Sequence, residues 1–150
     1  MVHALEEIHR LLKPDGVLID IHPVSEPSPI EIHQNGKIDL VGNLTVRQWC
    51  VDFELADKAL TEIVQHGIFA VEQKGIFDIL TYYDSAAEMG TAFKESIRKY
   101  ARNANSEVEE VPHAEALTAQ AEELLQAAGS EAMLVLREKD HISRLDQFEE

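Results

Sequence analysis

The sequence predicts a mixed fold of the α/β or α+β class, in which helices pack on one sheet. Apolar residues at helical spacing alternate along the chain with runs of β-favouring residues. Two of these runs flank an Asn-Gly dipeptide at residues 35–36, which is the strongest short signal for a β-hairpin. A chain of 150 residues has the size of one domain. We therefore expect a single domain over residues 1–142 and a frayed acidic tail over residues 143–150.

The first predicted elements are a helix over residues 4–13 and a buried strand over residues 17–21. The apolar face of this helix consists of Leu5, Ile8, Leu11 and Leu12. Pro14 cannot continue the helix, and the Asp-Gly pair that follows it supplies a turn. A run of apolar residues then begins the strand, which reaches a polar end before Pro23.

The middle of the chain predicts a hairpin, a helix and a second β segment. Apolar and polar residues alternate on both arms of the hairpin at residues 30–41, and a Gly-Asn pair ends it. Residues 44–66 carry an apolar stripe at helical spacing, and Gly67 is a suitable end for that helix. Residues 68–83 are rich in β-favouring side chains on both sides of Lys74-Gly75, which predicts a long strand or a hairpin.

The last third predicts two helices and a strand. Ser85 and Glu88 have the spacing of a capping box, which places a helix start there and a helix to about residue 101. Residues 102–111 form a polar connection, and Pro112 opens the next helix, which Gly129 ends. The apolar run at residues 132–136 is the final strand.

Charge and cysteine usage limit the classes of partner. The formal net charge of −15 argues against binding to nucleic acid or to an anionic membrane surface, because both would repel the chain. The single cysteine, Cys50, excludes an intrachain disulfide and is typical of a reducing cytoplasm. We interpret Cys50 as a small buried hydrophobe in preference to a nucleophile. We see no signal peptide and no apolar run of the ~18 residues that a membrane span needs.

The helix, turn and strand at the start of the chain resemble one known family. Class I S-adenosylmethionine-dependent methyltransferases carry a helix ending in Leu-Glu-Glu-Ile-x-Arg-Leu-Leu-Lys-Pro-Asp-Gly, followed by the fifth of seven strands. Residues 5–16 match that pattern in register, and residues 17–21 match the strand. The resemblance covers about the first twenty residues and implies a partial Rossmann-like sheet. It further implies that residues 76–83 and 133–136 are strands six and seven. Strand seven is antiparallel in this family, and the hairpin is an insertion.

The resemblance also implies where the family holds its cofactor. A Gly-rich turn after strand one and an acidic residue after strand two do most of that work. The seven glycines of this chain are isolated, and no G-x-G pair exists. We therefore expect a C-terminal methyltransferase half without the N-terminal cofactor-binding half, and no cofactor for this chain alone. S-adenosylmethionine would bind only where the missing half is supplied.

Such a half-sheet exposes the edge of the strand at residues 17–21. Stable proteins cover an exposed apolar edge, so we expect a homo-oligomer or a complementing chain there. Two functions remain open. The first is a methyltransferase-like protein, not catalytic alone, that acts by self-association or by binding a small ligand or a partner. The second is the substrate-side portion of a methyltransferase that is active only with the missing half.

Four residues are weak candidates for a functional site. Asp20 and His22 alternate with isoleucines and share one face at the strand end, where they can act as an orienting carboxylate and a general base. The alternative, which we favour, is that both simply cap an exposed strand end. Trp49 can line a substrate pocket, although core packing beneath the hairpin is favoured, and Tyr82 can offer a binding face. No metal site is expected, because the seven histidines show no ligand spacing.

Overall fold

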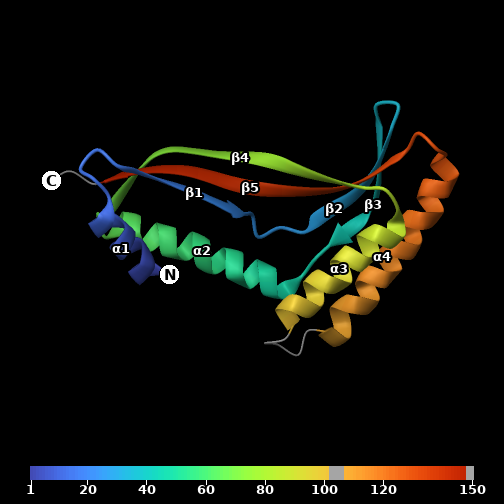
Figure 1. Cartoon of the computed structure of the whole chain (residues 1–150), viewed down its shortest axis with the longest axis horizontal. Helices are drawn as coiled ribbons and strands as arrows, with labels where there is room; N and C mark the ends of the chain where they lie inside the picture. Colours follow the sequence, from blue (N-terminus) through green and yellow to red (C-terminus); the bar gives the residue numbers. More distant parts are fainter. Residues whose placement is uncertain (102–106, 148–150) are drawn as a thin grey trace. The chain divides into compact units, whose positions relative to one another are not determined.

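The computed structural model describes residues 1–101 and 107–147. Within these residues the chain forms four helices and five strands, and the strands form an open antiparallel sheet. The predicted α+β class is thereby confirmed. The chain divides into two compact units (Figure 1). The first comprises Met1–Ser25, Val51–Asp78 and the residues from Lys139 onward, and the second comprises Glu26–Cys50 and Ile79–Glu138.

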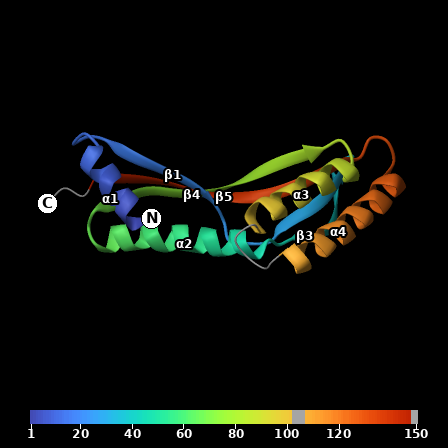
Figure 2. The same ribbon diagram turned by 60° about the horizontal axis from the view of Figure 1, so that its bottom comes forward.

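The first unit is a three-stranded portion of sheet with helices on one face. Strand β1 (Val17–Pro23) pairs antiparallel with the second part of β5 (Met133–Gln147), and β4 (Phe69–Tyr83) also pairs with β5. Figures 1 and 2 both place β5 between β1 and β4, with α1 (Val2–Leu11) and α2 (Arg47–Gln65) on one side. The core between these layers consists of Leu5, Ala59, Ile63, Phe69 and Leu145.

Strand β1 is an edge strand that is covered on one face only. Val17, Ile19 and Ile21 are 40%, 49% and 55% exposed, because no helix of the first unit packs on their face. Leu18, Asp20 and His22 alternate with them and are more buried. The prediction of a buried strand is therefore wrong for one of its two faces. Among the described residues, β1 pairs with β5 alone.

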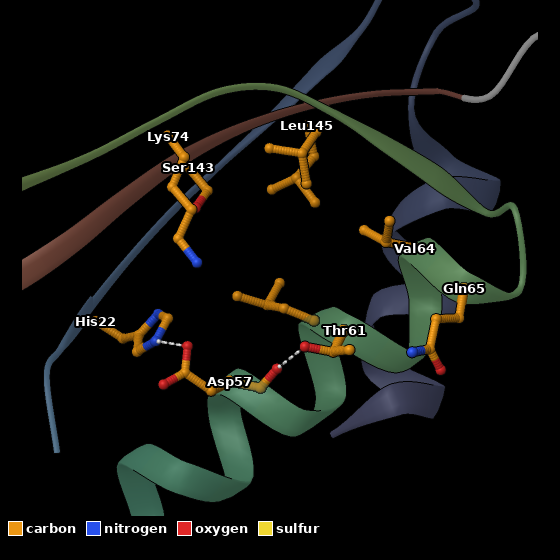
Figure 3. A pocket seen from close by; sticks show the side chains of 10 residues that line it. His22, Asp57, Thr61, Val64, Gln65, Lys74, Ser143 and Leu145 are labelled. Carbon is orange, nitrogen blue, oxygen red and sulfur yellow. Dashed lines mark hydrogen bonds and ion pairs between the residues drawn. The ribbon is translucent and has the colours of Figure 1, made fainter.

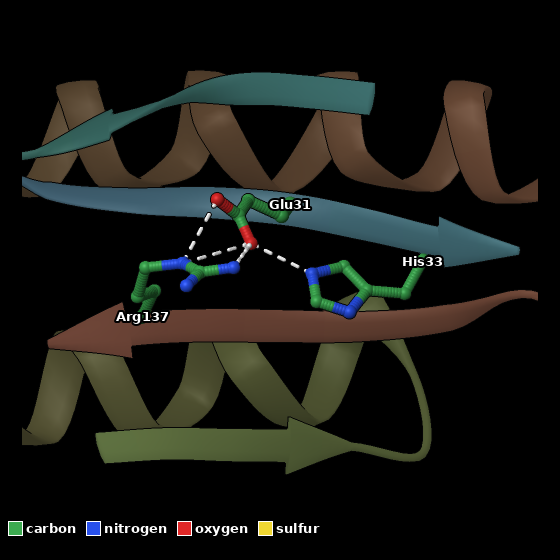
Figure 4. A network of polar contacts seen from close by, with 3 residues as sticks. All are labelled: Glu31, His33 and Arg137. Atoms are coloured by element: carbon green, nitrogen blue, oxygen red, sulfur yellow. Dashed lines mark hydrogen bonds and ion pairs between the residues drawn. The ribbon is translucent and has the colours of Figure 1, made fainter. Parts of the chain in front are cut away.

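The second unit is a two-layer arrangement of sheet and helices. The hairpin joins β2 (Ser28–Gln34) to β3 (Lys37–Leu44), and β2 pairs with the first part of β5. Figure 4 shows the order β3-β2-β5-β4, with neighbouring strands running in opposite directions and two helices behind the sheet. These helices are α3 (Ala86–Ala101) and α4 (Glu107–Ala128). Their core includes Ile30, Ile32, Met89, Phe93, Leu117 and Leu134.

The local signals that the sequence analysis used mark real boundaries. Asn35 and Gly36 have φ of 50° and 78°, which are the angles of a type I′ turn. Ser85 Oγ accepts from the Glu88 N–H at 3.1 Å, as a capping box requires. Gly67 and Gly129 follow helix ends with positive φ.

Two predicted boundaries are wrong, and one open alternative is decided by the structure. The pair at 42–43 does not end the hairpin, because β3 continues to Leu44. Of the two alternatives left open for residues 68–83, the long strand is confirmed, since Gly75 is not among the glycines with positive φ and β4 passes through it as one strand. Pro112 lies inside α4 and does not open it, because the helix already begins at Glu107. Residues 102–106 of the predicted connection lie outside the described residues.

The predicted frayed tail is largely part of the sheet. Strand β5 continues to Gln147, and Leu18 pairs with Leu145, which belongs to the core of the first unit. Residues 142–146 alternate between the two faces, as a half-buried strand requires. The side-chain amide of Gln147 also donates to the His9 carbonyl at 3.1 Å. Residues 148–150 lie outside the described part of the chain.

Candidate functional site

A cavity of about 190 Å³ opens in the first unit between α2 and the sheet (Figure 3). Strand β1 contributes one residue, α2 contributes five, and β4 and β5 contribute two each. The lining consists of His22, Asp57, Leu60, Thr61, Val64, Gln65, Val71, Lys74, Ser143 and Leu145. Apolar and polar side chains both face the cavity, which is usual for a small-molecule site.

His22 is held between two carboxylates at one end of this cavity. Its Nδ1 lies 2.6 Å from Asp20 Oδ2, and its Nε2 lies 3.1 Å from Asp57 Oδ1. The His22 side chain is only 10% exposed. A carboxylate can only accept, so both contacts are hydrogen bonds when both ring nitrogens carry protons. The His22 ring therefore joins β1 to α2.

The strand and helix periods place these three residues together. Asp20 and His22 are two positions apart on β1 and so share the face toward α2. Asp57 lies on α2 at i, i+3 and i+7 spacing with Leu60 and Val64, which also line the cavity. The alternation along β1 pairs Asp20 with His22 but does not predict that Asp57 joins them. A carboxylate in register with an apolar helical stripe is the signal that would have found it.

Strand β5 presents two further polar residues opposite this pair. His141 stands opposite His22, with ring centroids 5.4 Å apart, and Ser143 stands opposite Asp20. His141 Nδ1 is buried and has no hydrogen-bond partner within the described residues. Ser143 is 5% exposed and lines the cavity.

The geometry of His22 favours a role in binding over a role in proton transfer. A general base needs a free ring nitrogen within reach of the proton that it removes. Both nitrogens of His22 face protein carboxylates, so the ring acts as a clamp between β1 and α2. Of the two alternatives left open for Asp20 and His22, these contacts favour the structural one, in which both residues hold the strand end in place, over a general base with its orienting carboxylate.

The other two candidates lie in the second unit and do not line the cavity. Trp49 is partly buried and packs against the core of that unit. Tyr82 is 56% exposed. Its neighbour Tyr83 packs edge-on against Phe93, and burial, together with the nearby Glu138 and Glu88 carboxylates, raises the pKa of its phenol. Tyr83 is therefore a neutral phenol at ordinary pH.

The glycines with positive φ do not lie in a strand-to-helix turn. Of the seven glycines, those with positive φ are Gly36, Gly67 and Gly129, in a hairpin turn and after two helix ends. None of them forms the backbone cradle for a nucleotide that follows a strand. Within residues 1–101 and 107–147, no group of three histidine, cysteine or carboxylate side chains is arranged to hold a metal ion.

A second polar cluster lies on the helix-free face of the sheet in the second unit (Figure 4). Arg137 donates to both oxygens of Glu31 at 3.0–3.2 Å, and His33 Nε2 lies 2.7 Å from Glu31 Oε2. Glu31 is buried, which by itself raises the pKa of a carboxyl group. The hydrogen bonds from Arg137 and His33 outweigh burial, so the pKa of Glu31 lies below its ordinary value of 4.5.

We expect Glu31 to make the stability of the second unit depend on pH. Its pKa is lower in the folded chain, so its contribution is present above 4.5 and is lost as the pH falls through the folded value. The gap in unfolding free energy between wild type and Glu31→Gln should be widest near neutral pH and close in acid. Urea unfolding across this range measures it. An equal gap at every pH would contradict the expectation, and Asp39→Asn, in an exposed pair, is the matched control.

Comparison with known proteins adds no relative. No protein-family model, no curated protein and no solved structure matches the chain. Among the helices of the described ranges, none combines the length and apolar character that crossing a membrane requires.

Proposed function

We propose that the chain is a methyltransferase-like protein that is not catalytic alone and acts by association through the free edge of β1. One observation carries the proposal, namely the strand order of the first unit. The class I methyltransferase sheet ends in the order five, seven, six, with strand seven antiparallel. In the order β1-β5-β4, the strand that comes last in the chain likewise lies between the two that precede it, so that β1, β5 and β4 correspond to strands five, seven and six. Strand β5 is also antiparallel to β1. The matching helix and Lys13-Pro14-Asp15-Gly16 turn stand directly before β1.

The exposed side of β1 supports an interface at this strand. Among the described residues its second edge is unpaired, and Val17, Ile19 and Ile21 leave an apolar face uncovered. Full burial of one such side chain contributes roughly 1.5–3 kcal/mol, and half of each remains to be buried. A further strand that pairs with β1 would bury this face and satisfy the free backbone groups. A second copy of the chain or a complementing chain would supply it.

Association should therefore depend on the apolar face of β1. We expect the wild-type chain to form oligomers at micromolar concentration and Ile19→Lys to remain monomeric, because an ammonium group would be buried without a partner. Sedimentation velocity over a dilution series measures this. Ile38→Lys makes the same change at an equally exposed position on β3 and should leave association unchanged. A wild-type monomer at all concentrations, with no partner chain captured through β1, would contradict the proposal.

The second candidate is the substrate-side portion of a methyltransferase that is active only with a cofactor-binding half. The match of residues 5–16 to the family turn favours it. Calorimetric titration of S-adenosylmethionine into the chain separates the two. No submillimolar binding by the chain alone is expected, and such binding would overturn the first candidate. The lone Cys50 supports a cytoplasmic location as part of the same proposal.

A further inference from the structure

We propose that the cavity beside His22 binds a small zwitterion with an apolar side chain, the chemical class to which free α-amino acids belong. The proposal does not rest on the association of β1 described above, because every residue that it uses lies within the first unit. It rests on the charges at one end of the cavity, the apolar walls at the other end, and the Ser143 hydroxyl group that lines the cavity.

Asp57 supplies the negative group of the site. Its Oδ1 is engaged with His22, and its side chain is 42% exposed at the cavity. The cluster of Asp20, His22 and Asp57 carries one net negative charge even when His22 is an imidazolium ion. The second oxygen of Asp57 can therefore accept from a ligand ammonium group, in the stronger, charge-assisted form of a hydrogen bond.

Lys74 and Ser143 supply the groups that a carboxylate needs. Lys74 lines the cavity, and in Figure 3 its ammonium group extends toward the end where His22 and Asp57 lie. Ser143 is 5% exposed, and it lines the same cavity from β5. Its hydroxyl group can donate a hydrogen bond to a ligand. A ligand carboxylate beside Lys74 would accept from it.

The remaining walls suit an aliphatic or aromatic side chain. Leu60, Val64, Val71 and Leu145 line the cavity, and Figure 3 shows Val64 and Leu145 away from the charged end. A cavity of ~150 Å³ holds benzene, so about 190 Å³ accommodates a side chain of the size of leucine. An amine or an acid with one charge would leave Lys74 or Asp57 unmatched, and a site built for two charges rejects such ligands.

Titration with leucine and its two truncated analogues tests the proposal. L-leucine carries both charges, 3-methylbutylamine lacks the carboxylate, and 4-methylpentanoate lacks the ammonium group. Binding is followed by two-dimensional amide NMR of the full chain, up to ligand concentrations of about 10 mM. We expect leucine to shift resonances around the cavity and to bind at least ~10-fold more tightly than either analogue.

Variants assign the two charges separately. Lys74→Met should remove the preference for leucine over the amine, and Asp57→Asn should remove its preference over the acid. Ser143→Ala should weaken leucine binding without altering the preference between analogues. Lys58→Met makes the same charge change on α2 outside the cavity and should bind like wild type. Thermal melts confirm that each variant is folded.

The proposal is overturned by any of three results. The first is that leucine, valine and phenylalanine all leave the cavity resonances unmoved. The second is that an analogue with one charge binds as tightly as leucine, which would make the cavity a site for amines or for acids. The third is that Lys58→Met reduces binding as much as Lys74→Met, which would show that the effect is one of net charge.

Discussion

Phe69→Ala is expected to lower the unfolding free energy of the first unit by about 3–5 kcal/mol, the cost of a large core truncation. Phe69 begins β4 and is completely buried, and its ring meets His9 edge-on with centroids 5.2 Å apart. It packs with Ile63 of α2 and Leu145 of β5 in the core beneath the cavity. Urea unfolding followed by the NMR signals of first-unit residues measures the loss.

Phe77→Ala is the matched control for this change. Phe77 lies on the same strand and within the same unit, but it is 37% exposed. Its truncation removes less buried surface and leaves a smaller void, so a cost of about 1–2 kcal/mol is expected. Equal losses for the two variants would show that the core assigned to the first unit is wrong.

Glu31→Ala should destabilise the second unit by roughly 3 kcal/mol, because it removes a largely buried carboxylate that accepts hydrogen bonds from Arg137 and His33. Removing one member of a buried ion pair costs more than replacing both members by apolar side chains. The double variant Glu31→Leu with Arg137→Leu should therefore recover most of the stability. Guanidinium unfolding of the single and double variants tests this.

An exposed ion pair on the neighbouring strand provides the comparison. Lys37 and Asp39 are 2.8 Å apart on β3, but both side chains are at least half exposed. Asp39→Ala should cost less than ~1 kcal/mol, as surface pairs do. A loss for Glu31→Ala no larger than this, or a double variant less stable than the single one, would refute the importance of burial.

The parts of the fold that the sequence predicts are those that local chemistry decides. The Asn35-Gly36 turn, the Ser85 cap and the glycine after α4 each depend on one or two residues whose conformational preferences are strong. The length of β5 could not be predicted in this way. Residues 137–141 are consecutive polar residues that carry no strand pattern, and pairing with β1 and β2 makes them a strand.

The residues of the candidate site also fall into those that a local pattern predicts and those that only the tertiary fold brings together. A period of two placed Asp20 and His22 on one face of β1, and they do meet. Asp57 and Ser143 reach the same place from α2 and β5, and only the tertiary fold brings them there. No periodic pattern in the sequence links Trp49 to a polar partner. Its place against the core of the second unit follows from packing alone.

Strand β5 has a consequence for the order of folding. It pairs with β1 at residues 140–146 and with β2 at residues 133–136, and it follows both partners in the chain. Neither sheet portion can close during synthesis until these residues have left the ribosome. Strand pairs that are so far apart in the sequence form slowly, and until they form the apolar side chains of the strands stay exposed. The nascent chain should therefore be a substrate for chaperones, and its sheet should be completed late in synthesis.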